Sequence, residues 1–146
     1  MLDIPEGGFG AILVDCPWRY RNYSDKANGA ARAHYPGMTY RQLRAIPVGD
    51  MASEDAVILQ WGTWPKLDQA VDLLREWGFD FVSGIPWVKT TADGLKPRRA
   101  IGHWSMGCSE FALIGRRGKP KTTPVKPNVL GLLCGSKRAF WGPRPR

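Results

Sequence analysis

Short apolar runs recur along the chain, and each run predicts a β-strand. The first two, residues 11–14 (AILV) and 56–61 (AVILQW), are apolar over most of their length, as expected of strands that are covered on both faces. The other two are residues 79–89 and 109–118, and a glycine and a proline inside the former predict a bulge or an edge strand. Because no helix pattern separates these last two runs, we expect them to pair in antiparallel fashion.

A different spacing of apolar residues predicts helices. In residues 67–77 apolar side chains recur at steps of four, three and three, which gives one face of an amphipathic helix. Thr63 is its candidate N-cap, and Gly78 is expected to end it. A shorter helix is expected from Thr39, which can cap it, to Ile46, which precedes a proline.

The remaining segments lack a periodic pattern. Residues 19–36 are polar and predict a long mobile loop, whereas residues 119–146 combine a linker (KPKTTPVKPN), a short apolar run (VLGLLCG) and a basic end. The order of strand, loop and helix, strand, helix, strand and strand predicts an α/β fold. At 146 residues the chain is expected to form one domain over residues 1–118, followed by a linker and basic tail.

Charge points to a polyanionic partner. The chain has 21 Lys and Arg against 13 Asp and Glu, a formal net charge of +8, which favours nucleic acid first and an acidic membrane surface second. A basic surface that only keeps the protein soluble is the alternative.

Three widely spaced cysteines indicate neither a disulfide framework nor a zinc site, so no metal is expected. No signal-peptide pattern and no membrane-spanning run is found, so we expect a soluble, cytoplasmic protein.

Asp15 ends the first predicted strand and is followed at once by Cys16, Pro17 and Trp18. In open α/β sheets ligands bind beyond the carboxyl ends of the strands, so this acid is expected to face the binding crevice. A carboxylate, a backbone carbonyl in a proline-containing turn and a flat ring could together bind a planar amine. The alternative is that Asp15 caps the turn made by Pro17. A nucleophilic Cys16 is disfavoured, because no histidine lies near it in sequence.

The same four residues, DCPW, resemble the DPPW motif of the METTL-type adenine N(6)-methyltransferases, with Cys16 in place of the first proline. Three later segments resemble those of the family in the same order: HYPGMTYRQLRAIPV, VILQWGTWPKLDQAVDLLREWGFDFVSGIPWVKT and GHWSMGCSEFALIGRRGKP. The resemblance extends from Phe9 to Arg138. It implies a Rossmann-like methyltransferase sheet with permuted strand order, of which residues 1–118 would be the catalytic half.

The resemblance also implies a reaction, the transfer of a methyl group from S-adenosylmethionine to the exocyclic N(6) amine of adenine in nucleic acid. Asp15 would hold this amine and lie close to the methionine part of the cofactor. The carbonyls of Cys16 and Pro17 would direct the amine lone pair, and Trp18 would stack on the base. Catalysis would come from orientation and electrostatics, because the adenine amine is barely basic. Without the fixed φ of proline at Cys16, we expect lower activity but not its loss.

Other site residues follow from the resemblance. Lys89 would point at the carboxylate of the cofactor, or would be a solvated strand end. Tyr35 matches a tyrosine of the loop that closes over the site, and a packing role is equally open for it. His103 lies in a segment expected near the substrate, and a structural role is its alternative. The basic residues expected to meet phosphates are Arg19, Arg98 and Arg99. A solvated tail is the expectation for Arg116, Arg117, Lys119 and Lys121.

The family fold continues into a histidine-serine-x-lysine-proline motif, a helix and the first sheet strand with its cofactor loop, and none of these appears in the sequence. We therefore expect an incomplete sheet with an exposed inner edge and no residues for the adenosine side of the cofactor. A fragment, a frameshifted product and a subunit completed by a second chain are the alternatives. The expected substrate is DNA rather than RNA. The alternative function is a non-catalytic, basic nucleic-acid-binding module, which cofactor binding would distinguish.

Overall fold

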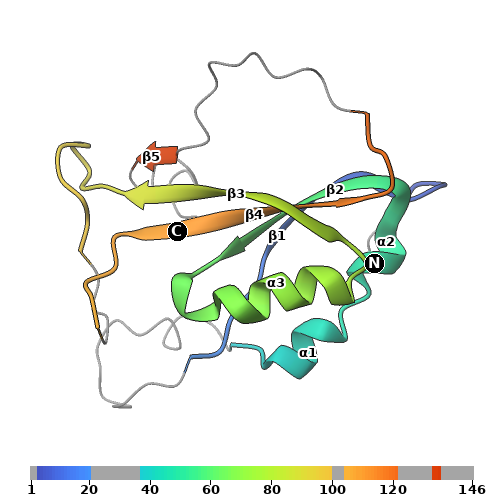
Figure 1. Ribbon diagram of the computed structural model, residues 1–146, viewed down its shortest axis with the longest axis horizontal. Coiled ribbons are helices and arrows are strands. Elements are labelled where there is room, and N and C mark those ends of the chain that lie inside the picture. Colours follow the sequence, from blue (N-terminus) through green and yellow to red (C-terminus); the bar gives the residue numbers. More distant parts are fainter. Residues whose placement is uncertain (1–2, 21–36, 100–103, 122–132, 136–146) are drawn as a thin grey trace.

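The computed structural model describes residues 3–20, 37–99, 104–121 and 133–135 (Figure 1). In these residues a mixed sheet has the strand order β1-β2-β4-β3-β5. Its strands are β1 (Phe9–Asp15), β2 (Ala52–Gly62), β3 (Asp80–Lys89), β4 (Ser109–Arg117) and the three-residue β5 (Leu133–Gly135). The helical elements are α1 (Tyr40–Arg44), α2 (Val48–Met51), the 3-10 turn η2 (Trp64–Lys66) and α3 (Leu67–Glu76). These residues form a small α/β domain, in the element order that the sequence predicts.

The directions of the strands bring several of their ends together. β1 and β2 are parallel, whereas β4 is antiparallel to both of its neighbours, β2 and β3. The expected antiparallel pairing of the third and fourth strands is therefore confirmed. As a result β1, β2 and β3 end at one edge of the sheet, where β4 begins. This edge, called the carboxyl edge below, carries Asp15, Gly62, Lys89 and Ser109.

The two longer helices form where the sequence predicts them, but only one of the two expected caps is present. The Thr39 hydroxyl accepts the Gln42 N–H at 3.4 Å and the Gln42 side-chain oxygen accepts the Thr39 N–H at 2.9 Å, a capping box that begins α1. The prediction that Thr63 caps α3 is wrong. Residues 64–66 form the 3-10 turn instead, and the Thr63 hydroxyl is hydrogen-bonded to Tyr20 at 2.5 Å. No helix in the described part of the chain is long and apolar enough to cross a membrane.

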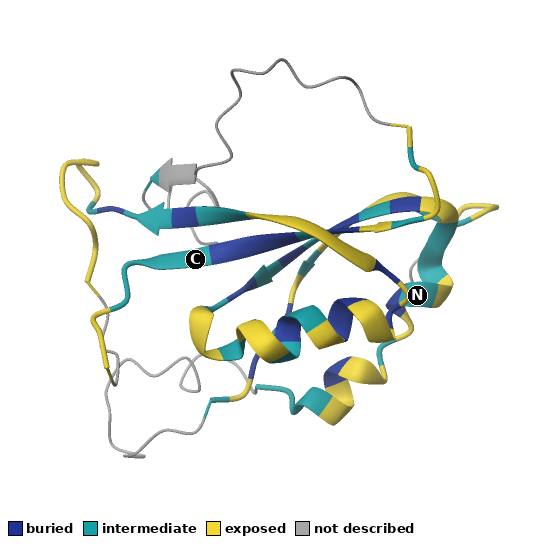
Figure 2. Ribbon diagram, in the orientation of Figure 1, coloured by how far each residue is buried: buried dark blue, intermediate teal, exposed yellow. Residues whose placement is uncertain are grey.

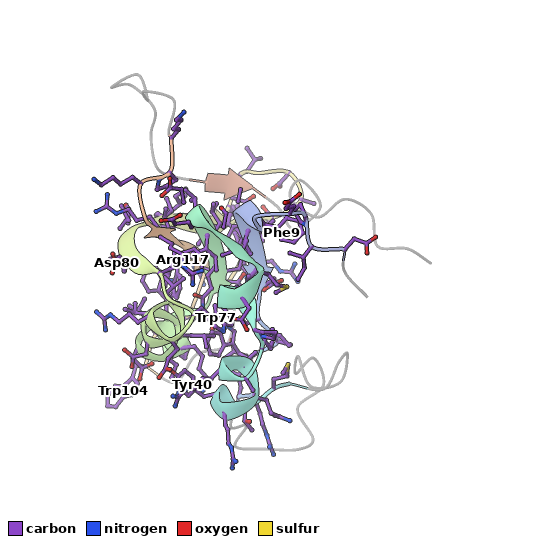
Figure 3. The ribbon with its side chains drawn as sticks, turned by 90° about the vertical axis from the view of Figure 1, so that its right-hand side faces the viewer. Phe9, Tyr40, Trp77, Asp80, Trp104 and Arg117 are labelled. Carbon is purple, nitrogen blue, oxygen red and sulfur yellow. The ribbon has the colours of Figure 1, made fainter. Side chains whose placement is uncertain are left out.

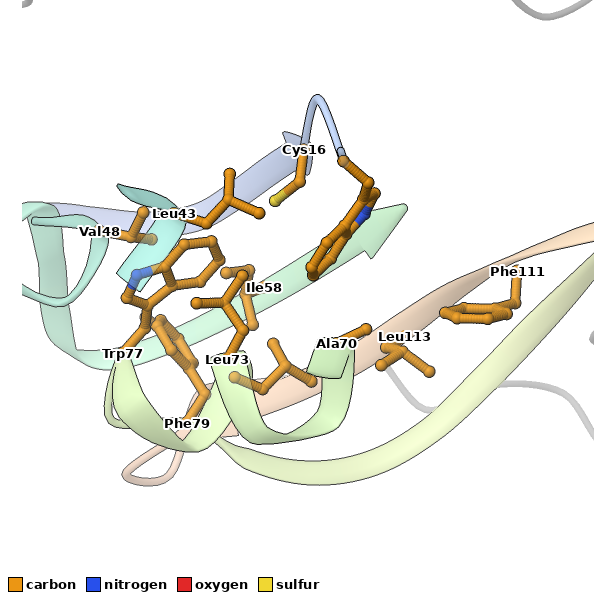
Figure 4. Packing of buried hydrophobic residues seen from close by; sticks show 13 residues of the cluster. Cys16, Leu43, Val48, Ile58, Ala70, Leu73, Trp77, Phe79, Phe111 and Leu113 are labelled. Carbon is orange, nitrogen blue, oxygen red and sulfur yellow. The ribbon is translucent and has the colours of Figure 1, made fainter. Parts of the chain in front are cut away.

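The hydrophobic core lies on one face of the sheet. α1 and α3 lie side by side on that face (Figure 1), and their inward sides are dark in the burial colouring of Figure 2. Leu73 of α3 and Trp77, which follows that helix, belong to one buried cluster with Ile58 of β2 and Leu113 of β4 (Figure 4). The steps of four and three residues in the sequence correspond to this buried side of α3.

The opposite face of β1 is less covered. Leu13 pairs with Leu59 of β2, which pairs with Ile114 of β4, so these residues lie in one row across the sheet. Leu59 and Ile114 are half-buried, but Leu13 is 64% exposed. Within the described residues, the expectation that the first strand is covered on both faces is therefore wrong. β1 is also the terminal strand of the sheet on its side, where the sequence predicts an open edge.

β3 combines a bulge with a mostly open outer side. Its register against β4 shifts between Phe81 and Ser83, so the expected bulge is present, a little before the predicted glycine and proline. Pro86 keeps its place in the ladder opposite Phe111. On the other side β5 pairs in parallel with residues 87–89 only. The short apolar run in the predicted linker and tail thus contributes a strand to the sheet.

Arg117 is not part of a solvated tail, contrary to the expectation. Its guanidinium donates hydrogen bonds to the carbonyl oxygens of Gly49 at 2.7 Å, Trp77 at 2.7 Å and Gly78 at 3.2 Å. It also lies over the Phe79 ring, 5.0 Å from the ring centroid. Figure 3 shows Arg117 close to Trp77. This side chain therefore joins the end of β4 to the end of α3 and to α2.

Candidate active site

Asp15 occupies the position that the sequence predicts, at the carboxyl edge. It is the last residue of β1 and pairs with Trp61 of β2, which places it where two parallel strands end together. The residue is exposed. A carboxylate at this position can accept hydrogen bonds from a ligand that lies beyond the strand ends.

The turn that follows Asp15 is held by backbone hydrogen bonds. The Cys16 carbonyl accepts the Trp18 N–H at 2.9 Å, and the Pro17 carbonyl accepts the Met38 N–H at 2.7 Å. Trp18 and Met38 also form an isolated parallel bridge. Because a carbonyl oxygen has two lone pairs, each of these acceptors can take one further hydrogen bond. The role predicted for the two carbonyls, to bind a substrate amine, is not tested by this geometry.

Cys16 has the environment of a structural residue. It is 6% exposed, and burial, followed by the nearby Asp15 carboxylate, raises the pKa of its thiol to about 12. The thiolate is the nucleophilic form, and at neutral pH this group is almost entirely protonated. The environment of Cys16 therefore disfavours a nucleophilic thiol, as the sequence analysis expects.

Trp18 is part of the core in this structure. It is 6% exposed and belongs to the same cluster as Leu43 and Ile58, shown in Figure 4. Its indole Nε1 has no hydrogen-bond partner among the described residues. Stacking on a base requires an accessible ring face, so the predicted role of Trp18 needs a rearrangement of this turn. That role stays a prediction.

The loops after β1 and β2 lie side by side at the carboxyl edge. The hydroxyls of Tyr20 and Thr63 are 2.5 Å apart, and Lys66 Nζ lies 6.0 Å from the centroid of the Tyr20 ring. The next residue after Thr63, Trp64, donates from Nε1 to the Ser109 hydroxyl at 2.8 Å at the start of β4. A chain of contacts thus connects the Asp15 loop to the beginning of β4.

Lys89 lies at the same edge, but two other strands stand between its strand, β3, and β1. Its ammonium forms an ion pair with Glu110 and lies 5.2 Å from the centroid of the Trp87 ring. Because β2 and β4 separate the strands of Asp15 and Lys89, about 14 Å of sheet width lies between them. A ligand that contacts both residues must, together with the length of the lysine side chain, bridge that width. The predicted cofactor role of Lys89 is not tested by this geometry.

The basic loop after β3 folds back on the strand end. Thr90 and Pro97 form a bridge, and the Arg98 N–H donates to the Lys89 carbonyl at 2.7 Å. The residues expected to meet phosphates are all exposed: Arg19, Arg98 and Arg99. Their charges are therefore available at the carboxyl edge, and the predicted contacts with phosphate stay predictions.

Two predicted site residues, Tyr35 and His103, lie outside the described residues. Glu110 and Trp64 are residues of the carboxyl edge that the sequence analysis missed. Glu110 lies near the start of the strand that pairs with β3, so a register assignment for the predicted antiparallel pair would have brought it near Lys89. For Trp64 the sequence gives only its place after a strand, which is the usual place for binding residues.

The comparison with protein families agrees with this geometry. The model of the MT-A70 family matches residues 9–129, a range that begins at β1 and includes the DCPW turn. This chain belongs to the MT-A70 family. The family comprises N(6)-adenine methyltransferases, which use S-adenosylmethionine and act on nucleic acid.

Three relatives show that the sequence similarity is distant. Type II methyltransferase M.MunI of Mycoplasma sp is 23% identical over 89% of this chain and 60% of its own length. The N(6)-adenosine-methyltransferase MT-A70-like protein of Drosophila melanogaster is 27% identical over 78% of the chain and 17% of its own length. The human N(6)-adenosine-methyltransferase catalytic subunit METTL3 is 24% identical over 79% of the chain and 18% of its own length. The chain thus spans less than two thirds of each of these relatives, and less than a fifth of the latter two.

Proposed function

We propose that this protein takes part in the transfer of a methyl group from S-adenosylmethionine to the N(6) amine of adenine in nucleic acid. The observation that carries the proposal is the exposed Asp15, which ends a parallel strand and precedes a hydrogen-bonded turn in a segment that matches the family. The position fits ligand binding beyond the strand ends.

In this proposal Asp15 accepts a hydrogen bond from the target amine. A carbonyl of the following turn accepts the second one, through the lone pair that its backbone hydrogen bond leaves. Two acceptors hold both amine protons, so that the nitrogen becomes more tetrahedral and its lone pair points in one direction. The gain comes from orientation and from a fixed electrostatic environment, and no strong base is required.

The charges of two described residues suit one end of the cofactor. S-adenosylmethionine, when bound, supplies a methyl group on an electrophilic sulfonium. Its amino-acid end carries an ammonium and a carboxylate, which suit the exposed Asp15 and the cation of Lys89. The Lys89 ammonium is already paired with Glu110, however, so a cofactor carboxylate would have to share or displace that partner. In the described part of the chain we assign no residues to the adenosine end.

DNA is the proposed substrate ahead of RNA. Of the three relatives compared, the Type II methyltransferase M.MunI matches over 60% of its length, whereas the two named as adenosine methyltransferases match over 17% and 18%. A second chain that completes the fold is part of the proposal, because β1 is the terminal strand of the described sheet and its Leu13 is 64% exposed.

A non-catalytic nucleic-acid-binding module is the second candidate. The net charge of +8 and the exposed arginines at the carboxyl edge favour binding whether or not methyl transfer occurs. Binding of S-adenosylmethionine distinguishes the two candidates, since only the enzyme requires it.

The test is methyl incorporation from labelled S-adenosylmethionine into adenine-containing DNA, with RNA in parallel, by wild-type protein and by Asp15→Ala. We expect a loss of at least about 100-fold, typical of removing one oriented hydrogen-bonding group from a transition state. Asp80→Ala is the matched control, because Asp80 is also an exposed acid but lies at the opposite end of the sheet. Equal incorporation by Asp15→Ala and wild type would exclude the proposed role of Asp15.

A further inference from the structure

Trp64 presents an aromatic surface to solvent at the carboxyl edge. It begins the 3-10 turn that follows β2, and it is 49% exposed. Contact of this apolar ring surface with water is less favourable than its burial. The position therefore offers a surface that a planar ligand could cover.

The ring of Trp64 is held in place by two neighbours. Its Nε1 donates to the Ser109 hydroxyl at 2.8 Å, so its one polar group is already satisfied within the protein. Its ring meets that of Phe111 edge to face, with centroids 5.1 Å apart and an interplanar angle of 66°. The part that remains exposed is aromatic surface, which binds by stacking rather than by hydrogen bonding.

Trp64 also lies close to the candidate active site along the sheet edge. Asp15 and Trp61 are in register, and Trp64 follows three residues later in β2 and its turn. The adjacent Thr63 is hydrogen-bonded to Tyr20, in the loop that follows Asp15. An adenine whose amine reaches Asp15 would thus lie near the Trp64 indole. The same holds for the next base along the nucleic-acid chain.

Two other tryptophans are less suited to the task. Trp18 is 6% exposed and is packed in the core, whereas Trp104 is fully exposed and stands clear of the ribbon in Figure 3. Trp64 combines an accessible surface with a fixed orientation, which lowers the entropic cost of binding. Lys66, two residues away, adds a cation near the same turn.

We propose that Trp64 is a base-binding residue, whose exposed surface stacks on an unpaired nucleobase of the nucleic acid that this protein binds. The proposal rests on the proposed function for its ligand class and adds the residue that supplies the stacking surface. Stacking on aromatic side chains tolerates any base, so Trp64 contributes affinity and position rather than sequence preference.

The test measures binding of a single-stranded, adenine-rich oligodeoxynucleotide with one 2-aminopurine, and of an abasic strand of the same length, to the full chain at low salt. For the base-containing strand we expect Trp64→Ala to bind roughly 5- to 100-fold more weakly and to lose the quenching of 2-aminopurine by stacking. Trp64→Phe should keep most of the affinity. Phe81→Ala is the matched control, since Phe81 is 46% exposed near the start of β3, away from the carboxyl edge.

The outcomes separate this proposal from the proposed function. If the wild type binds the base-containing strand and Trp64→Ala binds it equally well, the stacking role is wrong and nucleic-acid binding stands. If Trp64→Ala loses the same factor on the abasic strand, the indole does not act through a base, and the proposal is also overturned. If the wild type binds neither strand, nucleic-acid binding itself is absent, and the proposed function fails together with this inference.

Discussion

Nη2 of Arg117 donates a hydrogen bond to the carbonyl oxygen of Trp77 over 2.7 Å, which fixes the end of α3 against the end of β4. The residue after Trp77, Gly78, has a φ of +80°, and its carbonyl accepts a further hydrogen bond from Arg117 Nε at 3.2 Å. The last carbonyls of a helix have no partner within it. Arg117 supplies those partners from a strand 40 residues away in sequence.

The first prediction concerns the stability that this contact provides. Arg117→Ala removes three hydrogen bonds from a charged donor and leaves their carbonyl acceptors to find water, so we expect a loss of about 2–3 kcal/mol in the free energy of unfolding. Arg116→Ala is the control, because Arg116 is exposed and should change stability by at most about 0.5 kcal/mol. Urea denaturation followed by circular dichroism measures both. Equal midpoints for the two variants would show that the Arg117 contacts add no stability.

The role of Arg117 also shows what the sequence does not reveal. The end of β1 at Asp15 and the buried side of α3 follow from apolar runs and from a helical period, which are local patterns. The contacts of Arg117 with Gly49 and Trp77 span 68 and 40 residues, and no local pattern encodes such a pair. In the sequence this arginine therefore cannot be told from its exposed neighbour.

The candidate site likewise has features that local sequence patterns predict and features that they do not. Asp15 is predictable because strand ends can be read from the sequence, whereas the burial of Trp18 depends on Leu43 and Ile58, which belong to other elements. β2 begins at Ala52, four residues before its apolar run, because the pairing of Ala52 with Phe9 of β1 extends it across polar residues. Tertiary contacts thus decide the features that the local patterns miss.

The second prediction follows from the environment of Cys16. Since burial raises the pKa of its thiol to about 12, we expect Cys16 to resist alkylation by iodoacetamide at pH 8 in the native protein. Cys108 is only half-buried and should react first. Mass spectrometry of peptides after timed alkylation identifies the modified residue, and urea should make the two equally reactive. Rapid native labelling of Cys16 would show that the turn after β1 opens readily.

The raised pKa of Cys16 also predicts a loss of protein stability at high pH. The pKa of Cys16 is higher in the folded state than its ordinary value of 9.0, so folding favours the protonated thiol. Its contribution is fully present below about pH 9 and is lost as the pH rises from there toward 12. Cys16→Ser should reduce this alkaline loss of stability, which urea denaturation at pH 8 and pH 10 can measure.

The third prediction concerns the electrostatic part of nucleic-acid binding. With a net charge of +8, the affinity for DNA should fall steeply between low and physiological salt. Arg98→Ala and Arg99→Ala should each lower the slope of log K against log salt by about one, because each removes one phosphate contact. Arg116→Ala, at the opposite end of β4, is the control and should leave the slope unchanged. A dissociation constant that does not depend on salt would contradict this prediction.

The fourth prediction concerns the ion pair of Lys89 and Glu110, whose side chains are 15% and 27% exposed. If Lys89 binds the carboxylate of S-adenosylmethionine, Glu110 competes for the same ammonium. We therefore expect Lys89→Ala to weaken binding of the cofactor by about 10-fold or more, as for a hydrogen bond to a charged group. Glu110→Gln removes the competing charge and should maintain or raise the affinity.

Decarboxylated S-adenosylmethionine is the control ligand for this prediction, because it lacks the group that Lys89 would hold. Lys89→Ala should bind it as wild type does, and calorimetry with any second chain that the fold requires can measure both ligands. Removing one partner of a largely buried pair also lowers stability, so thermal unfolding of each variant must be recorded. A purely structural ion pair would give a different result, because Lys89→Ala and Glu110→Gln would then each lower the affinity for both ligands to the same extent. That result would assign Lys89 to the fold of the carboxyl edge and leave the cofactor carboxylate to another residue.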